Sequence, residues 1–198
     1  PKAVNKKDMI PYNYVYCSDA QQLANEMSTG NKTSSLLFGI QWDLVCKFLE
    51  VKGNWDTSTN TAQYYIKNDS TSWGNYNNSS ITLARGKYNT NPISSSSTWI
   101  SFNTDSENVT LSKTNSSTSY YQLLTTGASE DTNKMNIYDF AGNEYEWTLE
   151  KSTTADIPCS LRGGFYSYGG GGSNFPAASR IAANTTSSSN IGLRVSLY

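Results

Sequence analysis

The sequence NIYDFAGNEYEWT, at residues 136–148, predicts two short strands separated by a turn. The strand-like segments are Met135–Tyr138 and Glu144–Leu149, and both contain the aromatic and branched side chains that favour β-structure. A glycine lies between them, as is typical of a turn. This stretch therefore places β-structure in the C-terminal part of the chain.

Two more motifs follow this stretch, LRGGFY at residues 161–166 and NIGLRVSLY at residues 190–198. They predict strands over Cys159–Phe165 and Ile191–Tyr198, and the second has apolar residues at alternate positions, as in a half-buried strand. The Gly-rich stretch between these strands is too long for a tight hairpin turn. We therefore expect it to cross one end of the sheet.

Upstream, the sequence predicts two helices. Residues 18–28 favour a short helix with Ser18 as its N-cap and Gly30 as its stop. Residues 39–52 favour a longer helix that ends at Gly53. The expected apolar face of the longer helix has the spacing i, i+3, i+4 and i+7 and consists of Trp42, Val45, Cys46 and Leu49.

Residues 54–128 are polar, lack a sustained helical period and carry many aromatic residues. We interpret this region as long loops and short strands held in place by buried rings. Two N-terminal helices followed by short antiparallel strands and long loops define an α+β fold class.

Length and composition limit the classes of protein to which this chain can belong. Its 198 residues suit one domain over residues 1–198, although two small domains are possible. A net charge of −1 provides no basic field for nucleic acid. No run of 18 apolar residues is present, which argues against membrane insertion by this segment. Because the chain begins at Pro1, we interpret it as the C-terminal part of a longer protein.

Charged residues form only 16% of the chain, and Ser, Thr and Asn are abundant. Such a neutral polar surface favours an extracellular, cell-surface or virion location. There is no histidine, which excludes His-based catalytic triads and His-containing zinc sites. The three cysteines, Cys17, Cys46 and Cys159, are widely spaced, and their spacing does not choose between the possible disulfides.

The last segment of the chain, residues 165–198, has a restricted composition. It contains no Lys, Glu, Gln, Met or Trp, although all five are common in residues 1–164. Every residue type present in it can be reached from an asparagine codon by replacing one or both leading adenines. This pattern suggests codons altered at adenines, and so a surface kept for binding over residues 165–190. The alternative is an ordinary Gly/Ser/Asn-rich loop.

The three C-terminal motifs resemble those of the formylglycine-generating enzyme family, a variant of the C-type lectin fold. The shared pattern is N-x-x-D-x-x-G-N-x-x-E-W at residues 136–147, then RGG at 162–164 and a terminal GLR at 192–194. The family's oxidases carry two catalytic cysteines after RGG, and residues 165–198 contain none. The resemblance therefore implies the scaffold without catalysis, and we expect no catalytic residues. A relative of the oxidases is the alternative.

The chain also resembles the variable proteins of diversity-generating retroelements, in which a C-type lectin scaffold ends in a diversified stretch closed by an I-G-F/L-R strand. This resemblance implies a ligand-binding protein of a cell surface or bacteriophage, with an unknown protein or glycan ligand. Tyrosine gives large contact area at low entropic cost, and Ser, Gly and Asn give adaptable hydrogen bonds. The expected ligand-binding residues are Phe165, Tyr166, Ser167, Tyr168, Asn174, Phe175, Ile181, Ala182, Ala183 and Ser188, although some of the rings, Phe165 above all, could instead be core.

A calcium site is the one cofactor that the family resemblance suggests, and none is required. The matching positions are Asp139 and Glu146, through their side chains, and Gly142 and Glu144, through their backbone carbonyls, and such oxygen ligands suit calcium. The alternative is a strand turn with solvated carboxylates. Arg162 precedes Gly163 and Arg194 lies two residues after Gly192, and we expect both arginines to have structural roles. A purely structural domain of a surface or tail protein is the remaining alternative for the whole chain.

Overall fold

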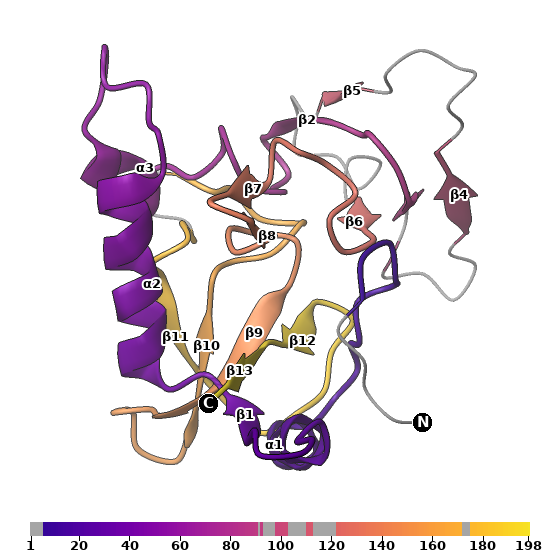
Figure 1. Ribbon diagram of the computed structural model, residues 1–198, viewed down its shortest axis with the longest axis vertical. Coiled ribbons are helices and arrows are strands. Elements are labelled where there is room, and N and C mark those ends of the chain that lie inside the picture. Colours follow the sequence, from indigo (N-terminus) through magenta and orange to yellow (C-terminus); the bar gives the residue numbers. More distant parts are fainter. Residues whose placement is uncertain (1–5, 91, 93–97, 103–109, 113–121, 172–174) are drawn as a thin grey trace.

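The computed structural model describes residues 6–90, 92, 98–102, 110–112, 122–171 and 175–198. The described part is a mixed α/β structure with few helices and many short strands in small sheets (Figure 1). Most of the strand pairs are antiparallel. Asn174, one of the expected ligand-binding residues, lies outside the described residues.

A four-stranded sheet contains most of the C-terminal sequence motifs. Its strands are β9 (Tyr145–Lys151), β10 (Cys159–Arg162), β11 (Arg180–Ala183) and β12 (Ile191–Leu193). The strand order is β11-β10-β9-β12. Strand β10 runs antiparallel to both of its neighbours, whereas β12 lies parallel to β9. The strand predicted over residues 144–149 is confirmed as β9, and the end of the chain supplies a parallel partner that the sequence did not suggest.

Three helices are present in the described residues: α1 (Cys17–Glu26), α2 (Gly39–Lys52) and α3 (Ala62–Lys67). Helix α2 confirms the predicted helix, including its end at Gly53. Helix α1 confirms the shorter helix, but the N-cap position is Tyr16 and not Ser18. Helix α3 was not predicted, because its single buried residue, Ile66, gives no periodic signal.

Two predicted strands are each divided in the structure. Residues 135–138 form the turn and second strand of a hairpin, because Met135 and Asn136 adopt positive φ angles of 55° and 63°. The final strand breaks at Arg194, since β12 pairs with β9 while the residues after it pair with a strand near the N-terminus. The remaining strands are β1 (Ser34–Leu36), β2 (Ser80–Thr82), β3 (Lys87–Asn89), β4 (Trp99–Ser101), β5 (Thr110–Ser112), β6 (Leu123–Leu124), β7 (Asn133–Lys134), β8 (Ile137–Tyr138) and β13 (Val195–Leu197).

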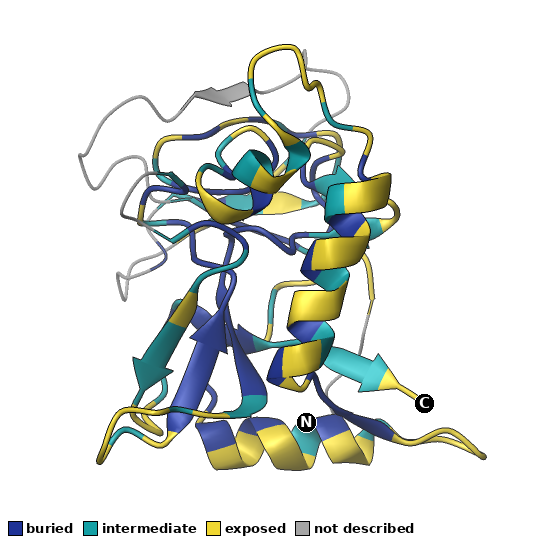
Figure 2. Cartoon of the chain, turned by 90° about the vertical axis from the view of Figure 1, so that its left-hand side faces the viewer, coloured by how far each residue is buried: buried dark blue, intermediate teal, exposed yellow. Residues whose placement is uncertain are grey.

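The buried hydrophobic residues of the described chain form three clusters, and Figure 2 shows which segments are buried. The first cluster joins α1 to the sheet through residues such as Trp147, which is fully buried. The second cluster lies under α2 and contains Trp42, Trp73 and Tyr76, all at most 1% exposed. Buried rings therefore do hold part of the region from residue 54 to 128. Among the described residues, no helix is long and apolar enough to cross a membrane.

Candidate functional site

The RGG motif forms a rigid turn at the end of β10. Gly163 and Gly164 have φ angles of 90° and 78°, a conformation that other residues rarely adopt. A side chain on Gly164 would collide with the carbonyl oxygen of Phe175. The carbonyl oxygen of Gly163 accepts hydrogen bonds from the amide of Gly142 at 2.8 Å and the hydroxyl of Tyr76 at 2.9 Å. These contacts fix the point from which the segment 165–190 begins.

Beyond this turn, five aromatic rings pack together. The ring centroids of Tyr145 and Phe165 are 4.7 Å apart, and Tyr168 lies 4.9 Å from Phe165 and 5.3 Å from Phe175. Tyr166 packs edge-on against Phe165 at 5.7 Å. Tyr168 is 49% exposed, whereas Phe165 and Tyr145 are buried beneath it. The arrangement is an exposed ring supported from below by fixed ones.

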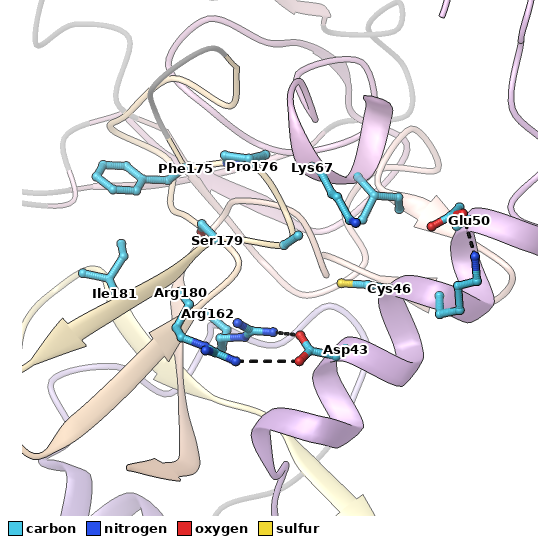
Figure 3. A pocket seen from close by; sticks show the side chains of 13 residues that line it. Asp43, Cys46, Glu50, Lys67, Arg162, Phe175, Pro176, Ser179, Arg180 and Ile181 are labelled. Atoms are coloured by element: carbon cyan, nitrogen blue, oxygen red, sulfur yellow. Dashed lines mark hydrogen bonds and ion pairs between the residues drawn. The ribbon is translucent and has the colours of Figure 1, made fainter. Parts of the chain in front are cut away.

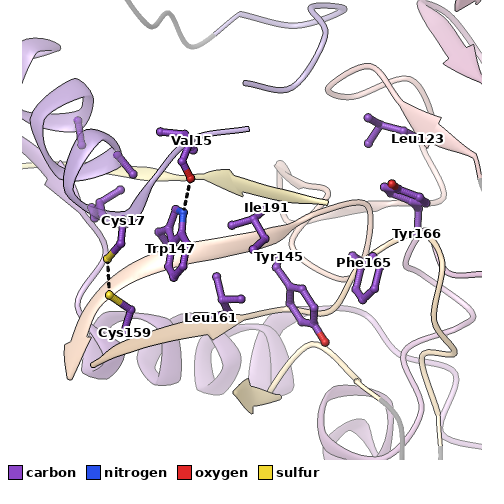
Figure 4. Packing of buried hydrophobic residues seen from close by; sticks show 13 residues of the cluster. Val15, Cys17, Leu123, Tyr145, Trp147, Cys159, Leu161, Phe165, Tyr166 and Ile191 are labelled. Atoms are coloured by element: carbon purple, nitrogen blue, oxygen red, sulfur yellow. Dashed lines mark hydrogen bonds between the residues drawn. The ribbon is translucent and has the colours of Figure 1, made fainter. Parts of the chain in front are cut away.

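Two of the expected ligand-binding residues are corrected by this arrangement. Phe165 is 5% exposed and Tyr166 is 0% exposed, so neither ring can contact a ligand at the surface. Both belong to the core cluster beside the central sheet (Figure 4). The hydroxyl of Tyr166 lies 3.4 Å from that of Ser189, and burial raises the pKa of Tyr166 to about 12. Phe165 contacts the exposed ring of Tyr168, and Tyr166 contacts Phe165.

The other expected residues lie at the surface but not in one patch. Ser167 is half-buried beside the ring cluster. The three residues Ile181, Ala182 and Ala183 are half-buried on β11, the edge strand of the sheet. Ser188 lies just before β12 at the opposite edge, and its carbonyl oxygen accepts a hydrogen bond from the amide of Tyr14. Three strand spacings, about 14 Å, therefore separate it from β11.

A groove lies where β11 and the preceding loop face α2 and α3 (Figure 3). Its volume is about 790 Å³, within the range of about 300–1,000 Å³ for small-ligand sites. Nearly half of the residues that line the groove belong to the segment 165–190. These residues are Phe175, Pro176, Ala178, Ser179, Arg180 and Ile181.

The charges in the groove belong to residues far apart in the sequence. Asp43 on α2 forms ion pairs with Arg162 of the RGG motif and, at 3.7 Å, with Arg180. Arg180 also contacts Glu150 at 2.6 Å. The side chain of Arg162 is 2% exposed, whereas that of Arg180 is 53% exposed. The exposed arginine is the one that a ligand in the groove can reach.

The sequence did not single out Asp43 or Arg180 as candidates for the site. Asp43 occurs in the motif QWD and Arg180 lies within the restricted segment, so each carried a weak signal. Cys46 also lines the groove, and burial raises the pKa of its thiol to about 12. Cys46 is therefore a neutral thiol near pH 7 and a weak nucleophile.

The four residues suggested for calcium lie close together in the sequence, and their carboxylates make other contacts in the structure. Asp139 accepts hydrogen bonds from the amide of Gly127 and the hydroxyl of Thr132, both at 2.8 Å. The carboxylate of Glu146 pairs with the guanidinium of Arg194 at 2.7 Å, so a cation already neutralises it. In the described part of the chain, no three acidic, His or Cys side chains are grouped to bind a metal.

The side-chain carboxyl of Glu144 accepts a hydrogen bond from the side chain of Asn13 at 2.9 Å. We therefore expect the melting temperature to be the same in calcium chloride and in EDTA. Differential scanning calorimetry in the two buffers checks this expectation. A melting temperature that rises by several degrees in calcium, and does not rise in the variant Asp139→Asn, would show that calcium binds at this site.

The buried carboxyl of Glu144 predicts a dependence of stability on pH. Burial raises its pKa well above the usual 4.5, and the neighbouring Glu146 and Asp139 add to this effect. The folded state then holds a proton that the unfolded state releases, so this contribution to stability is lost as pH rises through the folded-state pKa.

We expect the melting temperature in EDTA to rise by a few degrees when the pH falls from 7.5 toward 5.5, and Glu144→Gln to reduce this rise. Asp19, exposed on α1, provides the control Asp19→Asn. A pH profile that is the same in Glu144→Gln and the wild type would show that Glu144 titrates normally.

Comparisons with protein-family models, with curated proteins and with solved structures find no match to this chain.

Proposed function

We propose that this chain is a ligand-binding protein that displays a diversified surface on a C-type lectin scaffold and has no catalytic activity. Its scaffold would be of the formylglycine-generating enzyme type, and its diversified segment would be residues 165–190. The ligand would be a protein or glycan on a cell surface, met by an extracellular, cell-surface or phage protein.

The proposal rests on one observation: within the segment 165–190, some side chains are buried and others are exposed. Phe165, Tyr166 and Ala177 are buried and fix the path of the chain, while Tyr168 and Arg180 are exposed. Exchange of the exposed side chains leaves the buried ones in place, which is what a diversified surface requires. An exposed tyrosine on a rigid support also has the properties of a binding hot spot.

The C-type lectin assignment is supported by how the motifs meet. The turn at Gly142 contacts the RGG turn through the amide hydrogen bond to Gly163. The GLR residues lie beside β9, so all three motifs occupy one region of the sheet. Strands β1 and β13 pair the two ends of the described chain.

An oxidase relative is the less favoured alternative. The segment after RGG contains no cysteine, and the thiol closest to the groove, Cys46, is neutral near pH 7 because burial raises its pKa. A thiol in this state does not bind copper or attack a substrate readily. A copper-dependent oxidation assay on a cysteine-containing peptide discriminates between the two functions, and turnover would favour the oxidase.

Sequencing sibling genes from one population tests the proposed function directly. We expect differences to concentrate at the exposed and half-exposed positions of the segment, such as Tyr168, Phe175 and Ile181. The buried positions Tyr166 and Ala177 should remain constant. A neighbouring reverse transcriptase gene and a near-identical template repeat should accompany the gene. Differences spread evenly over the chain, without such neighbours, would favour a purely structural domain.

A further inference from the structure

Two cysteines that are 142 positions apart in the sequence meet in the core. Cys17 is the first residue of α1 and Cys159 is the first residue of β10. Their sulfur atoms lie 2.7 Å apart, with the thiol of Cys159 directed at Cys17 (Figure 4). Both side chains are buried, at 4% and 9% exposed, and both are free thiols in the structure.

The backbone around each cysteine holds the pair in place. The amide of Cys17 donates a hydrogen bond to the carbonyl oxygen of Thr185, which follows β11. Strand β11 pairs with β10 so that Ala183 lies opposite Cys159. On the other side, the indole nitrogen of Trp147 donates to the carbonyl oxygen of Val15 at 3.0 Å. The meeting of the two thiols therefore follows from the main-chain register.

We propose that Cys17 and Cys159 form a disulfide bond in an oxidising environment and that this bond fastens α1 to the central sheet. The oxidant would be a small-molecule disulfide such as oxidised glutathione. One cysteine thiolate attacks the oxidant and releases one glutathione thiol, forming a mixed disulfide. The second cysteine then displaces the other glutathione, so two protein thiols and one oxidised glutathione give one protein disulfide and two reduced glutathione molecules.

Burial of the two cysteines determines at which stage of folding the disulfide can form. Desolvation is the main cause that raises the pKa of Cys17 to about 12, and the adjacent Cys159 adds to it. In the folded, reduced chain Cys17 is therefore almost entirely a neutral thiol at pH 7 and attacks disulfides slowly. Formation of the bond therefore belongs to folding, before α1 closes over the sheet. Burial of both sulfur atoms then keeps reductants from reaching the finished bond.

Cys46 has no part in this bond, because it lies in the other core cluster, beneath α2. It therefore serves as an internal control for any thiol measurement. This inference does not depend on the proposed ligand-binding function, since the cysteine pair lies where α1 meets the sheet and outside the ring cluster.

The test is to refold the chain from denaturant in a mixture of oxidised and reduced glutathione, alkylate it under denaturing conditions and map its peptides by mass spectrometry. We expect one cross-linked peptide pair that joins Cys17 to Cys159 and alkylation of Cys46 alone. Before alkylation, the intact oxidised chain should weigh two hydrogen atoms less than the fully reduced chain. Alkylation of all three cysteines, or a cross-link that contains Cys46, would overturn the proposal.

Thermal unfolding supplies a second measurement. The melting temperature of the oxidised chain should be about 5–15 °C higher than that of the same chain unfolded in the presence of a reductant. The variant Cys46→Ala should retain this difference, and the double variant Cys17→Ala, Cys159→Ala should lose it. If the double variant does not fold, peptide mapping of Cys46→Ala still decides, because its two remaining thiols must either pair or be alkylated.

Discussion

Replacing Arg194 with Met is expected to lower the free energy of unfolding by about 2–4 kcal/mol, because the half-buried guanidinium is the charged partner of the buried carboxylate of Glu146. The guanidinium of Arg194 contacts the carboxylate of Glu146 at 2.7 Å and 2.8 Å. It also donates to the carbonyl oxygens of Tyr138 and Asp139, both at 3.1 Å. Loss of this side chain would leave a buried carboxylate and two carbonyl oxygens without their donor.

Urea unfolding measures this effect, provided that the slope with denaturant stays unchanged. Lys47→Met is the matched control, because Lys47 is 65% exposed and pairs with Glu50 on the surface of α2. A surface pair of this kind should change stability by less than about 1 kcal/mol. Adding Glu146→Gln to Arg194→Met should recover part of the loss by removing the unpaired charge. A cost below about 1 kcal/mol for Arg194→Met would show that water satisfies Glu146.

The sequence predicts elements whose side chains repeat regularly. Helix α2 was predicted with its end because Trp42, Cys46 and Leu49 recur at helical spacing and are buried. Strand β11 was missed because its sequence, RIAA, has weak local preference for any structure. It is a strand because β10 pairs with all four of its residues, and such a tertiary contact leaves no local signal.

The candidate site shows the same limit at the level of single side chains. Tyr166 and Tyr168 are the same residue type and lie two positions apart. In a strand, this spacing would place both side chains on the same face. The chain turns instead, with the amide of Tyr168 donating to the carbonyl oxygen of Phe165 at 3.3 Å. This turn sends Tyr166 into the core and Tyr168 to the surface. The groove could not be predicted from the sequence either, because Asp43 on α2 and Arg180 on β11 come together only in the folded chain.

Replacing Tyr168 with Ala is expected to weaken ligand binding by at least about 30-fold, which corresponds to about 2 kcal/mol, the lower limit for a hot spot. The probe is the tightest binder found in a panel of purified cell-surface proteins and glycans, with affinity measured by calorimetry. Tyr168 is 49% exposed and rests on Phe165 and Phe175, so its ring is held in place before a ligand arrives. Such preorganisation reduces the entropic cost of binding.

Tyr166→Ala is the matched control, since it removes the same ring from a fully buried position. It should lower the free energy of unfolding by about 3–5 kcal/mol, whereas Tyr168→Ala should change it by less than about 1 kcal/mol. Lost binding without lost stability in Tyr168→Ala identifies a contact residue. Unchanged binding in that variant, with Phe175→Ala and Arg180→Ala also unaffected, would remove the tail from the ligand interface. A binding loss only in Tyr166→Ala would instead mean that the scaffold, and not the exposed ring, limits recognition.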